Sequence, residues 1–242
     1  MKNHLKRVAS PKTWAINRKE KIFTVRPKPG AHSLENGLPL GVLIRDFLHL
    51  AETMSETKKI LNNKIVNVDG RRRKSHRFIV GLFDVVSLPE IKKHFRMLLD
   101  AKGRLFPSEI DEKESTFKIC KVVGKSVLRG GRIQYRLHDG KNVVPEQAAK
   151  AGDARTVAAK VGDSFVIGLP DLQIKRILPL KKGARVFLTG GKHVRDLGIL
   201  EEIKGSEAVY TLDGTEVATT KNYIFVVGEK EAEIELEWKG VS

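Results

Sequence analysis

Short apolar segments separated by glycine-containing turns fill the chain from about residue 115 to residue 228. In order, they are FKICKVV, RIQYRL, DSFVIGL, IKRILPL, ARVFL, LGILEEI, EAVYTL, EVATT and YIFVV. Short strands at spacings of about eight to twelve residues indicate a small β barrel. Since no helical periodicity continues beyond residue 110, we expect this half of the chain to be β throughout.

The first of these segments alternates between apolar and basic residues. Its two sides are Phe117, Ile119 and Val122 against Lys118 and Lys121. A half-buried strand alternates in this way. We therefore expect this segment to be a strand with the two lysines on the side opposite the apolar residues.

Residues 37–88 predict two helices followed by strands. The first helix has one apolar face, formed by Leu40, Leu43, Ile44, Phe47, Leu48 and Ala51. Ser55 is a plausible N-cap for a second helix that runs to about Asn62. KIVNV then alternates like a strand, Asp69-Gly70 is a strong turn signal, and FIVGLFDVVSL supplies one or two further strands.

Residues 89–110 are compatible with two structures. Ile91, Phe95 and Leu98 would suit the apolar face of a helix. FRMLLDAKGRLF equally suits a hairpin that turns at residues 100–103, with Gly103 in the left-handed conformation. We favour the hairpin.

The charge of the chain limits its partners. The formal net charge is +16 and the pI is about 9.9. Residues 1–80 hold 18 lysine and arginine residues against 6 acidic ones, whereas residues 81–242 hold 27 against 23. Such an excess points to nucleic acid, an anionic membrane or another polyanion, and we expect partner contacts to concentrate in the first third.

Residues 1–36 have scattered apolar residues and no sustained period. We expect a basic, poorly packed arm that becomes ordered on a partner; the alternative is a disordered surface tail. Residues 1–30 lack the apolar core of a signal peptide, and no run of about eighteen apolar residues predicts a membrane helix. Cys120 is the only cysteine, which excludes a disulfide within the chain and a Cys/His zinc cluster and suits a reducing compartment.

No pattern of catalytic residues stands out. Gly124-Lys125-Ser126 resembles the end of a phosphate-binding loop, but Ile119 stands where such a loop needs glycine. Neither a G-x-G-x-x-G nor a G-x-S-x-G motif is present, and the seven histidines are dispersed. His138-Asp139, just before Gly140, is interpreted as part of a turn. We therefore predict that the protein is not an enzyme and uses no cofactor or metal.

A basic constellation follows the second predicted helix. If that helix and strand 65–68 pack together, one edge collects Lys58, Lys59, Asn62, Lys64, Asn67, Arg71, Arg72, Arg73 and Lys74. Cations on a helix and an adjoining turn can contact successive phosphates, which positions a protein without reading base sequence. Backbone recognition of this kind is common for structured RNA.

Residues 40–88 resemble the small RNA-binding module shared by a bacterial ribosomal primary binder, some pseudouridine synthases and tyrosyl-transfer-RNA synthetase tails. Val68-Asp69-Gly70 matches its turn, and the stretch from Gly81 to Val86 matches its closing strand. Two features depart from the module. Leu38-Pro39-Leu40 replaces its basic opening, and Leu82-Phe83 separates Gly81 from Asp84. They suggest a divergent subtype.

From about residue 4 to 228, the chain is similar to the "S-four-e" family of archaeal and eukaryotic small-subunit ribosomal proteins. HLKRVASPKTWAI resembles its N-terminal segment, and FRMLLDAKGRLF with STFKICKV resembles the start of its central domain. LKKGARVFLTGGKHVRDLGILEEI resembles its KOW motif. The resemblance implies an α+β chain with five parts: a basic N-terminal arm (1–36), a two-helix-plus-sheet RNA-binding domain (37–88), a central β domain (89–177), an SH3-like KOW barrel (178–228) and an acidic tail (229–242).

The resemblance also implies a function. The family is non-catalytic and binds small-subunit ribosomal RNA as a structural constituent, so the expected partners are that RNA and neighbouring ribosomal proteins. A membrane or a small-molecule substrate is not expected. The implied location is the small ribosomal subunit in the cytoplasm, and the length and acidic tail favour an archaeal version.

Two further groups of RNA contacts are expected besides the basic constellation. In the arm they are Lys2, His4, Lys6, Arg7, Lys12, Trp14, Arg18 and Lys19. In the KOW loop they are Lys192, His193 and Arg195, for which a solvated loop is the alternative. Trp14 would either stack on a base or pin the arm to the barrel. Two other classes stay open: an RNA-modifying enzyme, and a transcription or translation factor that docks proteins on its KOW barrel.

Overall fold

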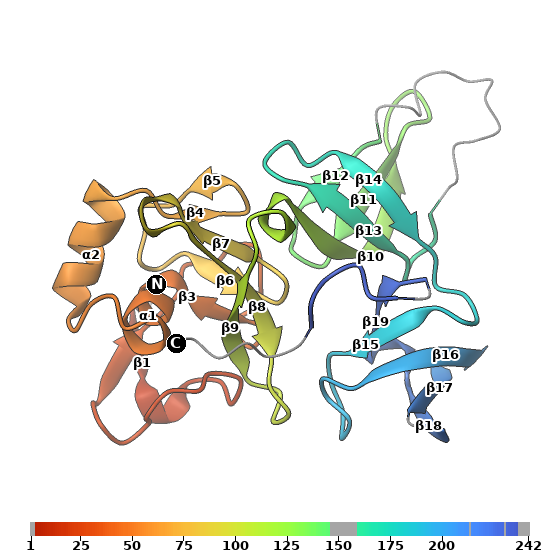
Figure 1. Ribbon diagram of the computed structural model, residues 1–242, viewed down its shortest axis with the longest axis horizontal. Helices are drawn as coiled ribbons and strands as arrows, with labels where there is room; N and C mark the ends of the chain where they lie inside the picture. Colours follow the sequence, from red (N-terminus) through yellow and green to blue (C-terminus); the bar gives the residue numbers. More distant parts are fainter. Residues whose placement is uncertain (1–2, 146–158, 213, 230, 237–242) are drawn as a thin grey trace. The chain divides into compact units, whose positions relative to one another are not determined.

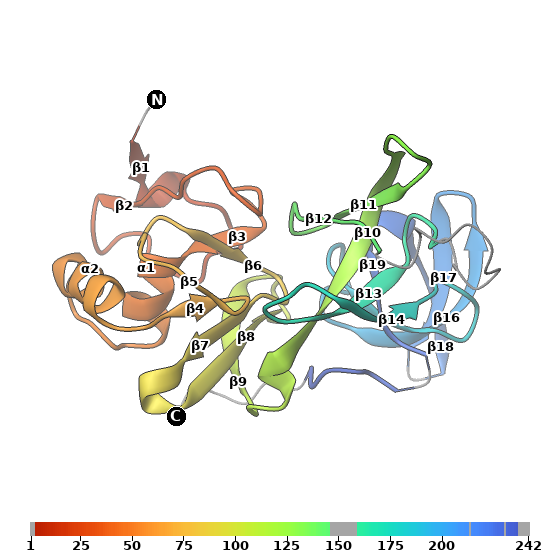
Figure 2. The same cartoon turned by 90° about the horizontal axis from the view of Figure 1, so that it is seen from above.

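Antiparallel strands are the main regular structure of the described residues, whose helices are few and short (Figures 1 and 2). The computed structural model describes residues 3–145, 159–212, 214–229 and 231–236. Contacts divide the described residues into two compact units, which join at residues 116 and 117. Within the described ranges, no helix has both the length and the apolar character needed to cross a membrane.

The first unit contains three sheets and the longest helix. Its strands are β1 (His4–Lys6), β2 (Phe23–Val25), β3 (Gly37–Pro39), β4 (Asn67–Val68), β5 (Arg71–Arg72), β6 (Ile79–Gly81), β7 (Val85–Leu88), β8 (Lys93–Leu99) and β9 (Leu105–Ile110). Its helices are α1 (Leu40–Val42), a π-helical turn (Leu43–Phe47), α2 (Met54–Asn63) and 3-10 turns at Arg7–Ala9, Pro89–Ile91 and Glu114–Thr116. β1 pairs with β2, β3 pairs with β6, and the remaining strands form a sheet in the order β5-β4-β7-β8-β9.

The first predicted helix is present but shorter than its apolar pattern suggests. Leu40, Leu43 and Ile44 are fully buried, as expected. After α1 the chain forms a π turn, in which the Leu48 N–H donates to the Leu43 carbonyl at 3.0 Å. His49 then has a φ of 51°, which stops helix propagation.

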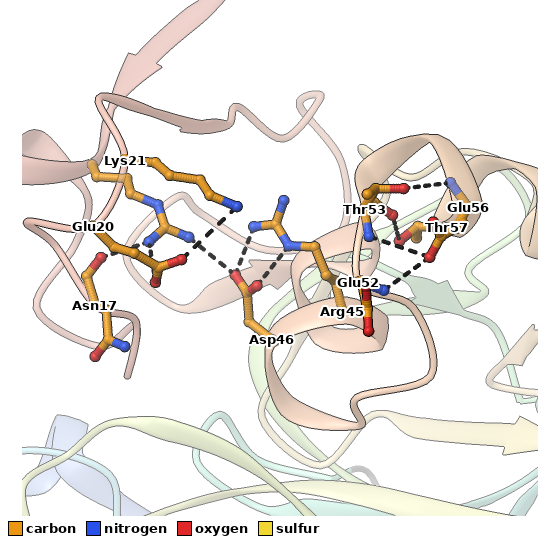
Figure 3. A network of polar contacts seen from close by, with 10 residues as sticks. Asn17, Glu20, Lys21, Arg45, Asp46, Glu52, Thr53, Glu56 and Thr57 are labelled. Carbon is orange, nitrogen blue, oxygen red and sulfur yellow. Dashed lines mark hydrogen bonds and ion pairs between the residues drawn. The ribbon is translucent and has the colours of Figure 1, made fainter.

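The second helix begins two residues earlier than predicted, with Thr53 rather than Ser55 as its N-cap. The Glu56 N–H donates to Thr53 Oγ1 at 3.2 Å, and the Thr53 N–H donates to Glu56 Oε2 at 3.4 Å (Figure 3). This reciprocal pair is a capping box. Ser55 has no such partner three residues on, so the prediction was wrong. Thr57 and Leu61 form the buried face of α2.

Both predicted hairpins of the first unit are confirmed. Asp69 and Gly70 have φ values of 51° and 72° and connect β4 to β5, as a tight hairpin turn requires. The 89–110 region is the antiparallel pair β8–β9, and Gly103 has a φ of 71°. Because β8 also pairs with β7, the second hairpin extends the sheet to which the first belongs.

The expectation of a poorly packed N-terminal arm is wrong around Trp14, which anchors this segment to the first unit. Trp14 is only 1% exposed, and its indole N–H donates to the Gly37 carbonyl at 2.7 Å. The Leu105 N–H donates to the Thr13 carbonyl at 2.8 Å, next to a bridge between Trp14 and Leu105. Trp14 therefore packs against elements distant in sequence, which no local period could reveal.

The second unit consists of two five-stranded antiparallel sheets, ordered β12-β11-β10-β13-β14 and β18-β17-β16-β15-β19. Its strands are β10 (Phe117–Val127), β11 (Ile133–Leu137), β12 (Asn142–Val143), β13 (Ser164–Gly168), β14 (Ile174–Leu178), β15 (Arg185–Leu188), β16 (Leu197–Lys204), β17 (Glu207–Leu212), β18 (Thr215–Thr220) and β19 (Ile224–Gly228). Helix in the described part of this unit is limited to the 3-10 turn Lys221–Tyr223. The predicted strand segments after residue 115 are thus confirmed.

Lys118 is buried, contrary to the alternating pattern. Its ammonium lies 2.6 Å from Asp139 Oδ2, and both side chains are at most 1% exposed. Burial alone would raise the pKa of Asp139, but the charges of Lys118 and Lys141 outweigh it and hold that pKa far below its usual range. The turn at Asp139-Gly140, which the sequence did indicate, therefore also supplies the counter-ion that lets a lysine point inward.

Lys121 is also used internally. Its ammonium donates to the carbonyls of Asn222 and Ile224 at 2.9 and 2.6 Å, which ties β10 to the start of β19. Burial, together with the nearby charge of Lys221, lowers the pKa of Lys121 to about 8. Neither Lys118 nor Lys121 is therefore a freely solvated surface cation.

Candidate nucleic-acid interface

The segment from residue 57 to 88 has no exposed carboxylate to offset its cations. It contains eight lysine and arginine residues and two acidic residues, Asp69 and Asp84. Both aspartates are buried. Asp69 accepts from the Val85 N–H at 3.1 Å, and Asp84 accepts from the Gly81 N–H at 2.9 Å and lies 2.9 Å from His32 Nε2. The surface of this segment is therefore strongly cationic.

Helix α2 and the β4–β5 hairpin are joined by one arginine. The Arg72 guanidinium donates to the carbonyls of Asn62 and Lys64, at 3.0 and 3.4 Å. These carbonyls lie at the C-terminal end of α2, where helical partners are lacking. We call the resulting surface the basic edge; it consists of Lys58, Lys59, Lys64, Arg71, Arg72, Arg73 and Lys74.

The residues of the basic edge differ in whether their side chains contact other residues of the protein. The Arg73 guanidinium lies 4.4 Å from the centroid of the Phe78 ring, and Lys64 forms a 2.7 Å ion pair with Glu90. Asn62 is exposed, and Asn67 is half-buried in β4. In the described part of the chain no ion pair engages the side chains of Lys58, Lys59, Arg71 and Lys74, which are all exposed.

Three residues beside the basic edge were not predicted. Burial lowers the pKa of His76, and the nearby charges of Lys58, Arg77 and Lys28 lower it further. The charges of those three residues are therefore felt at the His76 imidazole. Lys28 is held there by its N–H, which donates to the Arg77 carbonyl at 2.9 Å. The charge count of the segment could have indicated Arg77, but only the fold brings Lys28 to this place.

The predicted contacts in the N-terminal segment separate into two groups. His4, Lys6, Lys12 and Lys19 are exposed, and Lys2 lies outside the described residues. Trp14 is buried, so it cannot stack on a base, and it pins the segment to its own unit rather than to a barrel in the second unit. Arg18 donates to the carbonyls of Val8, Ser10 and Pro11 at 3.2, 2.7 and 2.7 Å.

Arg7 is likewise withdrawn from the surface. It is 3% exposed and contacts the Asn17 carbonyl at 2.6 Å, with longer contacts to Glu20 and Asp46 at 3.4 and 3.5 Å. Asp46 also accepts from Arg45 Nε at 2.6 Å, as Figure 3 shows. The prediction that Arg7 contacts RNA is corrected, because its guanidinium serves to join the N-terminal segment to the helical region.

A cavity of about 470 Å³ lies beside this network. Its charged lining residues are Arg7, Lys21 and Arg45 together with Glu20, Asp46 and Glu52. Three carboxylates offset three cations, so the cavity is a poor site for a phosphate. The basic edge, four of whose cations form no ion pair among the described residues, is the better candidate.

The predicted KOW-loop residues lie between β15 and β16 in the second unit. Lys192 is exposed, and His193 Nδ1 lies 3.0 Å from Asp196 Oδ2. Arg195 has a φ of 78°, and its N–H donates to the Leu188 carbonyl at 2.8 Å. Of the three, only Lys192 has its side chain fully exposed.

The described residues therefore form a β-rich chain with a cationic helix–hairpin edge. Two family models match it: Ribosomal family S4e over residues 91–174, and the RS4NT domain over residues 1–35.

Relatives and a solved structure agree with this. The chain is 41% identical to "Small ribosomal subunit protein eS4" of Methanosphaera stadtmanae, over 97% of this chain and 96% of the relative. It is also 41% identical to the protein of that name from Methanocaldococcus jannaschii, over 97% and 98%. The crystal structure of the 30S ribosomal protein S4e from Thermoplasma acidophilum superposes with a TM-score of 0.66, at 28% identity over 80% of this chain and 96% of that one. The chain therefore belongs to the eS4 family of small-subunit ribosomal proteins, which are structural constituents and not enzymes.

Proposed function

We propose that the protein binds small-subunit ribosomal RNA, with the basic edge gripping the phosphate backbone. The observation that carries this proposal is the exposed cationic surface of α2 and the β4–β5 hairpin, where Lys58, Lys59, Arg71 and Lys74 form no ion pair among the described residues. The heads of Lys58, Lys59, Arg71 and Lys74 are the primary contacts. Arg72 and Arg73 hold the hairpin in place and contribute charge to the same surface.

Contacts of this kind position the protein and do not read base sequence. Lysine acts on phosphate as a flexible point charge, and arginine can contact two phosphate oxygens at once. We assign secondary contacts to the exposed residues His4, Lys6, Lys12 and Lys19 and, in the second unit, to Lys192. Neighbouring ribosomal proteins are the further partners that membership of the family supports.

The finer division of the chain is part of the same proposal. Residues 1–36 are the basic N-terminal arm, 37–88 the RNA-binding domain, 89–177 the central β domain, 178–228 the SH3-like KOW barrel and 229–242 the acidic tail. Close packing on two glycines supports the KOW assignment. A Cβ at Gly190 would lie 2.5 Å from the Tyr223 ring, and one at Gly198 would lie 2.4 Å from the Tyr210 ring.

The proposal is tested by the salt dependence of RNA binding. The purified chain is titrated with small-subunit RNA fragments between about 50 and 200 mM salt, and we expect a steep fall in affinity because phosphate contacts release counterions. The variant with Lys58, Lys59, Arg71 and Lys74 all changed to Ala should bind weakly and show a smaller slope. Its control carries Lys102→Ala and Lys113→Ala, which remove exposed lysines outside the basic edge.

Two results would contradict the proposal. One is a flat salt response of the unmodified chain. The other is equal loss of affinity in the basic-edge variant and in the control. Co-sedimentation with small ribosomal subunits at high salt provides a second measurement, in which the basic-edge variant should be released at lower salt than the control.

A further inference from the structure

The hairpin formed by β10 and β11 carries a second set of cations, which none of the sites above includes. Residues 121–137 contain five lysine and arginine residues and no acidic residue. Lys121 is engaged internally, as described above. The other four are Lys125, Arg129, Arg132 and Arg136; we call them the hairpin cations. Within the described residues, none of them forms an ion pair.

The end of this hairpin stands in open space. Residues Leu128–Gly131 form the turn, in which the Gly131 N–H donates to the Leu128 carbonyl at 3.2 Å. Gly130 and Gly131 have φ values of 80° and 72°, and a Cβ added to either would meet no atom within 4 Å. Figure 2 shows the end of this ribbon extending beyond the rest of its sheet. Arg129 and Arg132 flank the glycines and are exposed.

A β-bulge lies in β10, at the end of the hairpin away from its turn. The register between β10 and β11 shifts between Val122 and Gly124, which leaves Val123 without a directly opposed residue. Gly124 pairs with Arg136, and a Cβ at Gly124 would lie 3.0 Å from Arg136 Nη2. The guanidinium of Arg136 therefore lies across the ribbon, over a position where only glycine leaves full room.

Two large apolar side chains on the same ribbon are exposed. Val123 is 48% exposed and Val127 is 75% exposed. Strands that face solvent usually carry polar residues on that side. Exposed valines between unpaired cations fit a surface that a polyanionic partner covers, because the cations contact phosphates while the valines lose their contact with water.

The amino-acid composition of the β10–β11 hairpin indicates which kind of polyanion it binds. Residues 121–134 contain no aromatic residue, and the ring of Tyr135 is buried. Single-stranded RNA is bound mainly by stacking its bases on aromatic rings, so a platform for splayed bases is absent from this ribbon. Folded RNA instead presents a continuous sugar–phosphate backbone, which arginine contacts without stacking.

We propose that the β10–β11 hairpin is a second RNA-binding site, which contacts the phosphate backbone of folded small-subunit RNA independently of the basic edge. This inference rests on the proposed function, since it takes the same RNA as ligand. It adds a separate contact region in the second unit, with Arg129 and Arg132 at the tip and Lys125 and Arg136 along the ribbon.

The test compares two charge-matched double variants of the full chain. One carries Arg129→Ala and Arg132→Ala. The control carries Lys182→Ala and Lys204→Ala, exposed residues of the same unit whose partners are Glu201 and Glu202. Binding to folded small-subunit RNA fragments and to unstructured oligouridylate is measured by fluorescence anisotropy at several salt concentrations. We expect the tip variant to bind folded RNA about tenfold more weakly, with a salt slope smaller by about 1 to 2.

The remaining outcomes distinguish the two proposals. Arg129→Lys with Arg132→Lys should restore most of the affinity for folded RNA, which shows that charge and not the fold of the tip was lost. If the tip variant binds like the control while the basic-edge variant is weakened, the hairpin site is wrong and the proposed function stands. If the unmodified chain does not bind the RNA, both are wrong.

Cross-linking gives an independent readout in assembled small subunits. A photoreactive amino acid is placed at Ser126, which is exposed on the ribbon, and we expect cross-links to RNA. Cross-links to protein alone would overturn the inference and identify the hairpin as a protein-docking surface. A photoreactive residue at Lys204 serves as the control position and should give fewer RNA cross-links.

Discussion

The N-terminal segment and the segment that carries the basic edge are almost equally basic in sequence but differ in how some of their arginines are used. Residues 1–36 hold nine lysine and arginine residues against two acidic ones, and residues 57–88 hold eight against two. In the first segment Arg7 and Arg18 turn inward to backbone carbonyls. In the second, most cations point to solvent, and Arg72 satisfies the carbonyls that α2 leaves open.

Backbone regularity explains this difference. The N-terminal segment consists of three-residue strands and turns, so many of its carbonyls lack a ladder partner and must find another donor. The guanidinium groups of Arg7 and Arg18 supply that donor. The basic edge is built from a capped helix and a tight hairpin, whose backbone groups largely satisfy one another. Its lysines are therefore left available for a ligand, and net charge alone does not identify a binding surface.

The largest expected effect tests whether the N-terminal segment is part of the fold. Trp14→Ala removes a buried ring and its hydrogen bond to Gly37, and we expect a loss of about 3–5 kcal/mol in the free energy of unfolding. Urea denaturation measures this loss, and limited proteolysis should show cleavage before residue 36. A variant as stable as the unmodified chain would mean that the segment is the loose arm that its sequence suggests.

Arg7→Gln tests whether a cation of the N-terminal segment serves the stability of the fold rather than RNA binding. Because the buried guanidinium bonds to a carbonyl and two carboxylates, its loss should destabilise the protein by about 2–3 kcal/mol. RNA affinity per folded molecule should be unchanged. A loss of affinity without a loss of stability would place Arg7 in the RNA interface after all. Lys6→Gln, one residue earlier and exposed, is the control for stability.

Substitutions of Arg71 and Arg72 distinguish a cation that contacts only RNA from one that also stabilises the fold. Arg71→Ala should weaken RNA binding about fivefold, as expected for one phosphate contact, and leave stability within about 0.5 kcal/mol. Arg72→Ala should also cost about 1 kcal/mol in stability, because it leaves the carbonyls of Asn62 and Lys64 without their donor. Thermal unfolding and RNA titration of both variants check this. Identical stability would show that Arg72 does not brace α2.

The smallest expected effect is a pH dependence of the affinity of the basic edge for RNA. In the free protein, burial and the charges of Lys58, Arg77 and Lys28 lower the pKa of His76. Bound phosphates offset those charges, so this pKa is higher in the complex and RNA binding is accompanied by proton uptake. Affinity should therefore rise about twofold to threefold as the pH falls from about 7.5 to 5.5. His76→Gln should remove this increment, and equal pH profiles for both proteins would place His76 outside the interface.

Sequence patterns predicted the strands and turns of this protein well because the information for them is local. The alternation of apolar residues identified the strands after residue 115, and Asp69-Gly70 and Gly103 identified two hairpins. The patterns failed where a distant partner decided the outcome. Trp14 looked isolated until Gly37 and Leu105 packed beside it, and Lys118 looked solvent-facing until Asp139 paired with it.

The candidate site was predictable in part for the same reason. The run from Arg71 to Lys74 and its turn are visible in the sequence, and so is the lysine pair of α2. The sequence does not show which of these cations bond to backbone carbonyls of the protein and which stay exposed, because that depends on which carbonyls the fold brings close to each side chain. The hairpin cations were overlooked because they are spread over twelve residues, and only the pairing of β10 with β11 gathers them on one ribbon.

The sequence by itself determined that the second half of this chain would be β throughout. It also determined that the chain is strongly basic, with its charge concentrated near the beginning. Periodicity, turn chemistry and net charge are properties of neighbouring residues or of simple sums. Tertiary structure decided which cations are available. A buried Arg7 or Lys118 and an exposed Lys58 or Arg129 are alike in the sequence. They differ because a charge can leave water only where the fold supplies a carboxylate or carbonyl to receive it.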